Sequence, residues 1–487
     1  MGRRVDRGER LTTTTRAVPA VERRFGATSA RLVTRTVPAC YTPDTSPIYG
    51  RFAGEVSNRR TGRDVAPAVP VTRLLGATLA DGRVVDVTLD RDRVETVTEV
   101  ARDGVVLLSD GVLDLHGYVL LPAPAEPHAH LDKALSWEVI RPPMGDLGLA
   151  IASWRAFAAT TTQAEIEGRA EAAALLALGH GTTAIRTHVD VLSGDDPLRG
   201  VRALVAVRER LRPLMDIELV ALAGPETSDA AVEAALDAGV DLVGGASHLA
   251  LDEDADLDRL LSIAQRYGVG VDLHVDESLV HGTTMRTFAE RTQGWTVNRT
   301  ASHCVRLGAY DPAERDEIIA ALLRSGVGVV ANPITNLYLQ GWDHEQLTPR
   351  GLAPMRALLD AGVPTAAGAD NVRDPFNPMG RGDTLETAML AVVAGHLTID
   401  EAYAAVSTGA RRVMGRPDAG PVVGARAELM AVRAASLAEV VAAAPVDRFV
   451  IHAGRLVAST TSTRSIADPS HTPAVSPSSP DLEGVMV

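Results

Sequence analysis

The sequence predicts an α/β protein, a (β/α)8 barrel with a small β-sandwich domain built from both ends of the ordered chain. Three observations predict it. Between residues 119 and 415, amphipathic helical segments that end in glycine alternate with short apolar strands. The alternation yields eight strand–helix units of roughly 30 residues each, the size of a TIM barrel. Short β-like runs flank this region at 72–120 and 421–458.

The composition excludes several classes of function. The chain has 487 residues, of which 46% are hydrophobic, so the chain can bury a large core and global disorder is excluded. A net charge of −14 and 3% aromatic residues disfavour a nucleic-acid partner. No apolar run reaches the ~18–20 residues that span a bilayer. Two cysteines, Cys40 and Cys304, make no disulfide framework. We expect a cytoplasmic protein, and a homo-oligomer is left open.

Both ends of the chain differ from the middle. Residues 1–70 contain 13 arginines and six acidic residues without a helical or strand period, which predicts a disordered basic extension. The alternative is a basic arm for an acidic partner. Residues 460–487 are rich in Ser, Thr and Pro and are expected to form a disordered tail.

The barrel helices are delimited by their capping residues. Glycine closes a helix in the left-handed conformation, and the glycines in this role are Gly181, Gly239, Gly268, Gly326 and Gly362. Asp311 before Pro312 predicts one helix start, and Thr398 with Glu401 forms a capping box at another. We place the first barrel strand at 119–122. A doubly wound open sheet is the structural alternative. The sequence does not favour it, because no Gly-x-Gly-x-x-Gly motif opens a helix.

The flanking β-like runs are short, and Asp-Gly turns at 81–82, 103–104 and 110–111 separate those on the N-terminal side. They occur at 84–87 and 104–108 on one side and at 427–432 and 448–452 on the other. Such turns between apolar runs are typical of antiparallel sheets. The sequence therefore predicts one small β domain made by both ends.

Polar residues follow the predicted strands, where a barrel places its chemistry. The strand-end segments are 126–133, 186–190, 224–226, 272–277, 302–303, 332–333 and 368–371, whereas the fourth strand ends in Gly244-Gly245 without a ligand side chain. His128 and His130 are two residues apart, so both side chains leave the same face of a strand. Alone, they are equally well two polar strand-end residues. With His188, His274, His303 and Asp370 also at strand ends, the pattern predicts a metal centre.

Simpler interpretations compete at individual positions. The alternative for His188 and Asp190 is a structural hydrogen-bonded pair, and the alternative for Glu277 is a solvated helix-capping acid. Lys133, the one lysine of the chain, is interpreted as a carboxylate partner at the barrel rim. The remaining histidines are interpreted as ordinary polar residues: His116, His180, His248, His281, His344, His396, His452 and His471.

Together these segments resemble the amidohydrolase superfamily, in its cytosine deaminase-like branch. The matching motifs are Glu-Pro-His-Ala-His-Leu-Asp at 126–132, Arg-Thr-His-Val-Asp-Val at 186–191, Leu-His-Val-Asp-Glu at 273–277, Ala-Ser-His at 301–303, Val-Ala-Asn-Pro at 330–333, Leu-Gln-Gly at 339–341 and Ala-Asp-Asn-Val-Arg-Asp-Pro-Phe at 369–376. They occur in order, and with the flanking β runs the resemblance covers 72–455.

The resemblance implies a site for one divalent metal ion, Zn²⁺ or Fe²⁺. The implied ligands are His128, His130, His274 and Asp370. It also implies that Glu277, His303 and Asp370 are catalytic. No lysine follows the fourth strand to carry a bridging carbamate, in agreement with one metal.

The residues at the positions that would contact the substrate differ from those of the cytosine deaminase-like branch. No glutamine follows the third strand, where Glu226 stands instead, and the strand-eight aspartate is followed by Asn371 and then by Phe376 rather than tryptophan. These three residues are the predicted substrate contacts, although Asn371 is equally a turn-stabilising residue and Phe376 a packing residue.

The predicted function is therefore hydrolytic deamination of a cytosine-like or related small nitrogen heterocycle, with release of ammonia. One alternative is a hydrolase that releases an alkylamine from an N-substituted triazine or opens a cyclic amide. A catalytically inactive barrel that acts as a binding protein is the other.

Overall fold

The computed structural model describes residues 68–100, 110–192, 194–279 and 284–466. Most of the predicted basic extension (1–67), most of the predicted tail (467–487) and the predicted strand at 104–108 lie outside these residues. Val69–Pro70, which we had assigned to the extension, instead form a short strand, because Val69 pairs with Leu456 in an antiparallel sheet.

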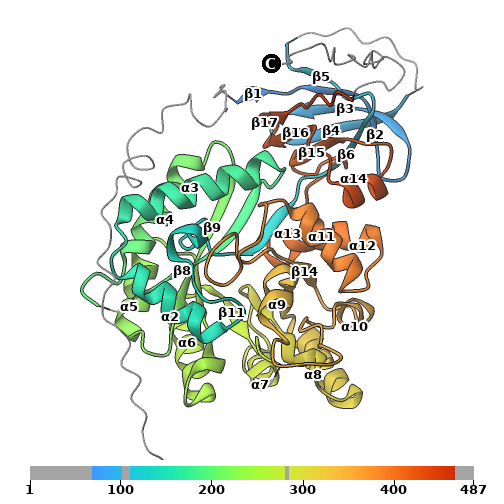
Figure 1. Ribbon diagram of the computed structural model, residues 1–487. Coiled ribbons are helices and arrows are strands. Elements are labelled where there is room, and N and C mark those ends of the chain that lie inside the picture. Colours follow the sequence, from blue (N-terminus) through green and yellow to red (C-terminus); the bar gives the residue numbers. More distant parts are fainter. Residues whose placement is uncertain (1–67, 101–109, 193, 280–283, 467–487) are drawn as a thin grey trace, which may run out of the picture. The chain divides into compact units, whose positions relative to one another are not determined.

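Eight parallel strands form the barrel (Figure 1). In sequence order they are β7 (Ala125–Ala129), β8 (Ala184–Asp190), β9 (Asp216–Ala223), β10 (Leu242–Gly245), β11 (Gly270–Val275), β12 (Arg299–His303), β13 (Gly328–Ala331) and β14 (Thr365–Ala367). Each strand pairs with the next one in the sequence, as strand–helix–strand units require. A bridge between Ala129 and Asp370 joins the first strand to the segment after the last. The predicted barrel is confirmed, and the open-sheet alternative is wrong.

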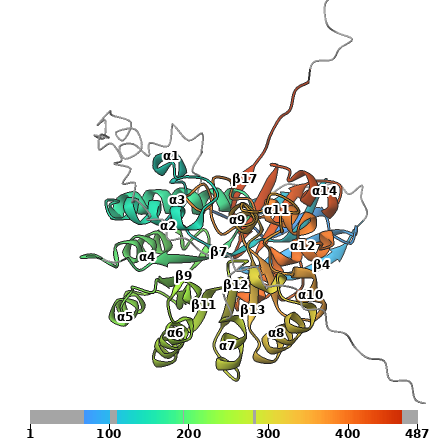
Figure 2. The same cartoon turned by 60° about the horizontal axis from the view of Figure 1, so that its bottom comes forward.

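Helices surround the strands (Figure 2). They are α1 (Trp137–Ile140), α2 (Leu147–Ala158), α3 (Gln163–Gly179), α4 (Arg199–Leu211), α5 (Asp229–Asp237), α6 (Glu253–Tyr267), α7 (Thr284–Arg291), α8 (Pro312–Ser325), α9 (Pro333–Leu339), α10 (Met355–Asp360), α11 (Thr384–Val393), α12 (Ile399–Ala405) and α13 (Thr408–Val413). Two short 3₁₀ turns, Ser247–Leu249 and Val305–Gly308, follow β10 and β12. The apolar faces of these helices and the outward residues of the strands form one continuous core.

The predicted capping residues are found at the helix ends. All five glycines have positive φ, and Gly268 and Gly326 are themselves the left-handed C-caps of α6 and α8. The Asp311 side chain accepts hydrogen bonds from the first turn of α8, and Thr398 with Glu401 makes the capping box of α12. These predictions are confirmed. Helix caps can be predicted from the sequence because each depends on only a few neighbouring residues.

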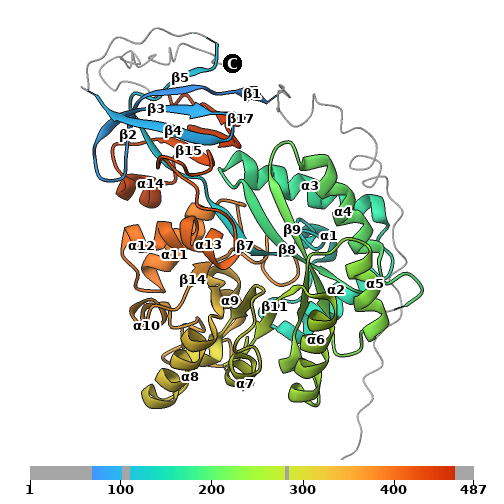
Figure 3. The ribbon, with the colours of Figure 1, turned by 180° about the vertical axis from the view of Figure 1, so that it is seen from behind.

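A second, nine-stranded sheet is built from both ends of the described chain (Figure 3). Its strands are β1 (Val69–Pro70), β2 (Arg73–Thr78), β3 (Val84–Asp90), β4 (Arg93–Glu99), β5 (Val112–Asp114), β6 (Tyr118–Pro122), β15 (Leu429–Arg433), β16 (Arg448–His452) and β17 (Arg455–Thr460), and helix α14 (Leu437–Ala443) lies between β15 and β16. The order is β1-β17-β16-β15-β6-β2-β3-β4, with β5 beside β2. Its core contains Leu74, Leu120, Leu429 and Ile451.

One predicted strand belongs to the other sheet. Residues 119–122, which we had assigned to the barrel, lie in β6 and pair with β15, for example Leu121 with Met430. The first barrel strand is Ala125–Ala129. Both segments are short and buried, so the sequence does not tell which of them enters the barrel. Among the described residues, no helix has both the length and the apolar character needed to cross a bilayer.

We predict opposite effects of alanine at two exposed glycines. Gly268 has φ +66°, and Gly268→Ala should lower the free energy of unfolding by about 1–2 kcal/mol, since the left-handed conformation disfavours a Cβ. Gly168 lies inside α3 with open space around its Cα, and Gly168→Ala should raise that free energy by about 0.5–1 kcal/mol. Urea denaturation measures both. Shifts of the same sign would contradict the assigned conformations.

Candidate active site

The predicted metal ligands and catalytic residues converge at the carboxyl ends of the barrel strands. His128 and His130 come from the end of β7, His274 from β11 and His303 from β12, while Asp370 follows β14. With Glu277, these six residues are at most 7% exposed. Residues separated by more than 200 positions in the sequence therefore share one buried site.

Three of the predicted ligands, His128, His130 and Asp370, form one candidate ion-binding group, and the fourth, His274, adjoins it through His130. His274 Nε2 lies 3.2 Å from His130 Nε2, and Asp370 Oδ1 lies 3.1 Å from His130 Nε2. His128 Nε2 is 3.6 Å from the same Asp370 oxygen. In a tetrahedral site with bonds of about 2.0–2.1 Å, ligand atoms stand about 3.3 Å apart. The arrangement fits a small divalent cation.

The protonation states and missing partners of these groups also fit a cation. Burial, with the neighbouring basic groups, lowers the pKa of His130 and His274 well below the usual range, so both rings are neutral at pH 7. Neutral imidazole is the form that binds metal. Both nitrogens of His128 and both carboxylate oxygens of Asp370 are buried without a hydrogen-bond partner. Buried polar atoms without partners are costly, and a bound cation would satisfy them.

Glu277 lies beside this cluster between two histidines. Its Oε1 is 3.7 Å from His303 Nδ1, and its Oε2 is 3.6 Å from His248 Nε2. Burial would raise the pKa of Glu277, but His303 and His248 outweigh burial and lower that pKa to about 2. The carboxylate is therefore ionised at neutral pH and ready to accept a proton.

His303 is held in one tautomer by its neighbour Asn336. The side-chain amide of Asn336 donates to His303 Nδ1 at 3.0 Å, so the ring proton is assigned to Nε2. Burial is the main cause that lowers the pKa of His303 to about 3. A neutral ring with a buried, unpartnered Nε2–H is a donor for an oxygen atom in the site.

The roles of His248 and Gln340 at this site were not predicted from the sequence. We had interpreted His248 as an ordinary polar residue, and the fourth strand as one that supplies no side chain. The 3₁₀ turn Ser247–Leu249 after that strand brings His248 to Glu277, and His248 Nδ1 contacts the backbone oxygen of His274 at 3.2 Å. Gln340 in the Leu-Gln-Gly motif donates to the backbone oxygen of Glu277 at 2.9 Å. Only the position of His248 three residues past a strand end signalled its role.

Lys133 is a carboxylate partner, as predicted, but at a buried position. Its Nζ lies 2.6 Å from Asp190 Oδ1 and 3.3 Å from His130 Nδ1. Trp154 Nε1 donates to the other oxygen of Asp190 at 2.6 Å. The alternative pairing of His188 with Asp190 is therefore wrong. His188 Nε2 instead faces Asp272 Oδ1 at 3.4 Å, because both side chains point into the barrel.

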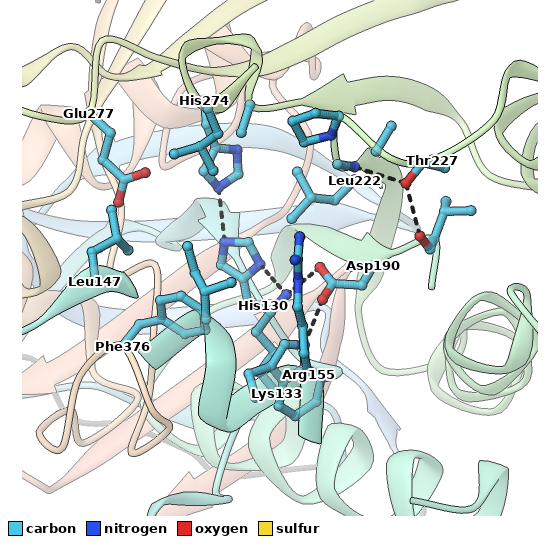
Figure 4. A pocket seen from close by; sticks show the side chains of 18 of the residues that line it. His130, Lys133, Leu147, Arg155, Asp190, Leu222, Thr227, His274, Glu277 and Phe376 are labelled. Atoms are coloured by element: carbon cyan, nitrogen blue, oxygen red, sulfur yellow. Dashed lines mark hydrogen bonds and ion pairs between the residues drawn. The ribbon is translucent and has the colours of Figure 1, made fainter. Parts of the chain in front are cut away.

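A cavity of about 160 Å³ opens onto the cluster. In Figure 4, Glu277, Leu147 and Phe376 lie on one side of this cavity and Asp190 and Thr227 on the other, with His130 and His274 between them. All three predicted substrate contacts, Glu226, Asn371 and Phe376, line it. Glu226 is exposed and forms an ion pair with Arg155 at 3.0 Å. The cavity has room for a small planar ring beside the predicted metal site.

The chain is similar to known hydrolases over most of its length. The profile of the Amidohydrolase family matches residues 155–458. A pterin deaminase of Rhizobium rhizogenes is 33% identical over 358 residues, which are 71% of this chain and 82% of that protein.

Two solved structures are also similar. A 5-methylcytosine deaminase from Klebsiella pneumoniae has a TM-score of 0.75 and 26% identity, covering 82% of this chain and all of that one. An N-isopropylammelide isopropylaminohydrolase from Burkholderia multivorans has a TM-score of 0.67 and 32% identity, covering 80% of this chain and 99% of that one. These comparisons confirm the resemblance found in the sequence.

We predict that the Lys133 ammonium is required for stability. Burial alone would lower the pKa of Lys133, but Asp132 and Asp190 outweigh it and raise the pKa to about 12. Lys133→Met leaves two carboxylates without their cation and should lower the free energy of unfolding by about 3–5 kcal/mol. Denaturation in the presence of a chelator keeps metal binding out of the comparison.

The control is Arg155→Met, which removes a cation from an exposed pair on the same side of the cavity. Exposed ion pairs contribute less than about 1 kcal/mol. Equal losses of stability in the two variants would contradict the prediction for Lys133.

Proposed function

The chain belongs to the amidohydrolase family, and from that premise we propose that it removes the amino group of a cytosine-like or related nitrogen heterocycle and releases ammonia. It is a hydrolase that acts on carbon–nitrogen bonds other than peptide bonds. The observation that carries the proposal is the buried cluster of His128, His130, His274 and Asp370, with Glu277 and His303 beside it at the end of a ring-sized cavity.

We assign one divalent cation, Zn²⁺ or Fe²⁺, to His128, His130, His274 and Asp370. When bound, such a cation lowers the pKa of water towards ~7 and so supplies a nucleophile at neutral pH. The remaining chemistry falls to side chains of the protein.

Two side chains transfer protons, and a third stabilises charge. Asp370 accepts a proton from the attacking water, and the Nε2–H of His303 stabilises the negative charge that develops on the attacking oxygen. The ionised Glu277 takes up one proton of the attacking water and gives it to the ring nitrogen next to the attacked carbon, and it then passes the second water proton, accepted by Asp370, to the leaving amine. The carbon–nitrogen bond breaks, ammonia leaves with the electron pair, and a carbonyl group remains on the ring.

The substrate contacts are proposed from the cavity wall. Phe376 is half-buried and offers a face for stacking on a planar ring, and Glu226 at the opening offers an acceptor for a ring N–H or amino group. The amide of Asn371 donates to Asp374 at 2.7 Å, and its oxygen faces Thr335 Oγ1 at 3.4 Å. These contacts favour the turn-stabilising interpretation of Asn371, which leaves Phe376 and Glu226 as the stronger proposed contacts.

The rival function is release of an alkylamine on the same site. The 32% identity to the N-isopropylammelide isopropylaminohydrolase supports it, because that identity is close to the identity to the pterin deaminase. A panel of cytosine, 5-methylcytosine, pterin and N-isopropylammelide, assayed for ammonia and for isopropylamine, separates the two. Ammonia from an amino-substituted ring supports deamination, and isopropylamine alone supports the rival. No product with zinc-loaded or iron-loaded protein would favour the inactive-barrel alternative.

The partners are small heterocycles by analogy with these relatives. A cytoplasmic location and a homo-oligomeric state stay predictions from the sequence.

We predict that Glu277→Gln lowers turnover by ~10²-fold or more, because glutamine cannot carry the proton. Metal content, measured by atomic absorption, should be unchanged. The control Glu165→Gln alters a half-buried capping glutamate of α3 and should keep turnover. Full activity of Glu277→Gln would show that another group shuttles the proton.

A further inference from the structure

A layer of charged side chains lies inside the barrel beneath the predicted metal site. Asp272 is on β11, two residues before His274, so both side chains point into the barrel. Arg186 on β8 is fully buried and meets Asp272 there, with Nη1 to Oδ2 at 2.9 Å. Burying a carboxylate directly below a set of predicted metal ligands is costly, so its position there requires an explanation.

Asp272 faces a ring nitrogen of one predicted ligand. His128 lies between two carboxylates: its Nε2 is 3.6 Å from Asp370 Oδ1, and its Nδ1 is 3.9 Å from Asp272 Oδ1. The Nδ1 atom is buried and has no hydrogen-bond partner. The ring of His188 packs against that of His128 with centroids 4.2 Å apart and the ring planes tilted by 44°. The ring of His128 therefore presents one nitrogen to the predicted metal site and the other to Asp272.

The chemistry of a metal-bound imidazole explains this orientation. A neutral imidazole that binds a cation through Nε2 carries its proton on Nδ1, and that N–H needs an acceptor. Asp272 Oδ1 is the carboxylate oxygen that faces it. We propose that Asp272 is a positioning residue that orients His128 towards the divalent cation and thereby sets the affinity of the site for Zn²⁺. The inference rests on the proposed function, because it presumes that the site holds a cation.

Contacts of Asp272 hold its carboxylate in place for this role. Ser302 Oγ donates to Oδ1 at 2.8 Å, and Arg186 supplies the compensating positive charge at Oδ2. Arg186 is itself fixed, because its Nε lies 2.6 Å from Glu218 and its Nη1 donates to Thr300 at 2.9 Å. A carboxylate that is neutralised and immobilised in this way is costly to displace, and it keeps one orientation.

A second cation bound by His128, His188 and Asp272 is the competing interpretation, since these three also lie close enough to share an ion. The Arg186 guanidinium on the same carboxylate opposes it, because two positive charges would then share one anion. A second cation would also have to bind Nδ1 of His128, although the same ring is proposed to bind the first cation through Nε2. The contacts favour an acceptor role for Asp272.

The test measures Zn²⁺ affinity directly, by competition with a chromogenic chelator, and stoichiometry by metal analysis. Asp272→Asn should bind Zn²⁺ about 10- to 100-fold more weakly than the unchanged protein. The control is Asp383→Asn, which alters another buried aspartate, the ion-pair partner of Arg448 at 2.7 Å, and should leave Zn²⁺ affinity unchanged. The Co²⁺-loaded protein should also show an altered visible spectrum only in Asp272→Asn.

The outcomes separate the inference from the proposed function. If the wild-type protein binds one Zn²⁺ and Asp272→Asn binds it with the same affinity, the inference is overturned and the proposed function is not. Two Zn²⁺ per chain also overturn it, in favour of the second cation. An unchanged protein that binds no Zn²⁺ or Fe²⁺ overturns the proposed function itself. If Asp272→Asn does not fold, Ser302→Ala serves instead: it should weaken affinity about 2- to 10-fold, and no change overturns the inference.

Discussion

The site depends on the closure of the barrel. The backbone N–H of Asp370 donates to the carbonyl oxygen of His128 at 2.9 Å, and the N–H of His130 donates to that of Asp370 at 3.2 Å. Three of the four proposed ligands therefore belong to the residues whose backbones join the first strand to the last. In an open sheet these two strands would lie at opposite edges, and the two histidines would have no common ion with Asp370. The same hydrogen bonds thus close the fold and fix the ligand geometry.

Buried side chains stabilise this junction. Glu126 accepts from the N–H of His128 at 3.0 Å and from the N–H of Ala369 at 2.9 Å, so one carboxyl group bridges both strands. A Cβ at Gly368 would lie 2.7 Å from Glu126 Oε1, so a larger residue there would displace the bridge. Asp370 has φ +64°, a conformation that non-glycine residues rarely adopt. The closed ring offsets that strain, and strain of this kind is typical of functional sites.

The sequence predicted what depends on local pattern and missed what depends on the closure. Glycine caps, the capping box and the strand-end histidines are encoded within a few residues, and they sufficed for the barrel and for the six side chains at its end. Residues 119–122 were misplaced because two short buried strands compete for the first position in the barrel. The alternation of side chains on β11 already placed Asp272 on the same face as His274, but its partners Arg186 and His128 lie on other strands. His248 was missed because its approach to Glu277 depends on a 3₁₀ turn after a strand without ligands.

Prediction of the substrate is limited for a physical reason. The proposed ligands and proton-transfer groups stand at the ends of strands, whose positions relative to one another are fixed by parallel pairing around the ring. The rest of the cavity wall is formed by helix α2 and the loops that carry Glu226 and Phe376, and loops vary without disturbing the ring. One set of strand-end residues is therefore compatible with release of ammonia or of an alkylamine. The reaction follows from the barrel, and the choice of heterocycle follows from the loops.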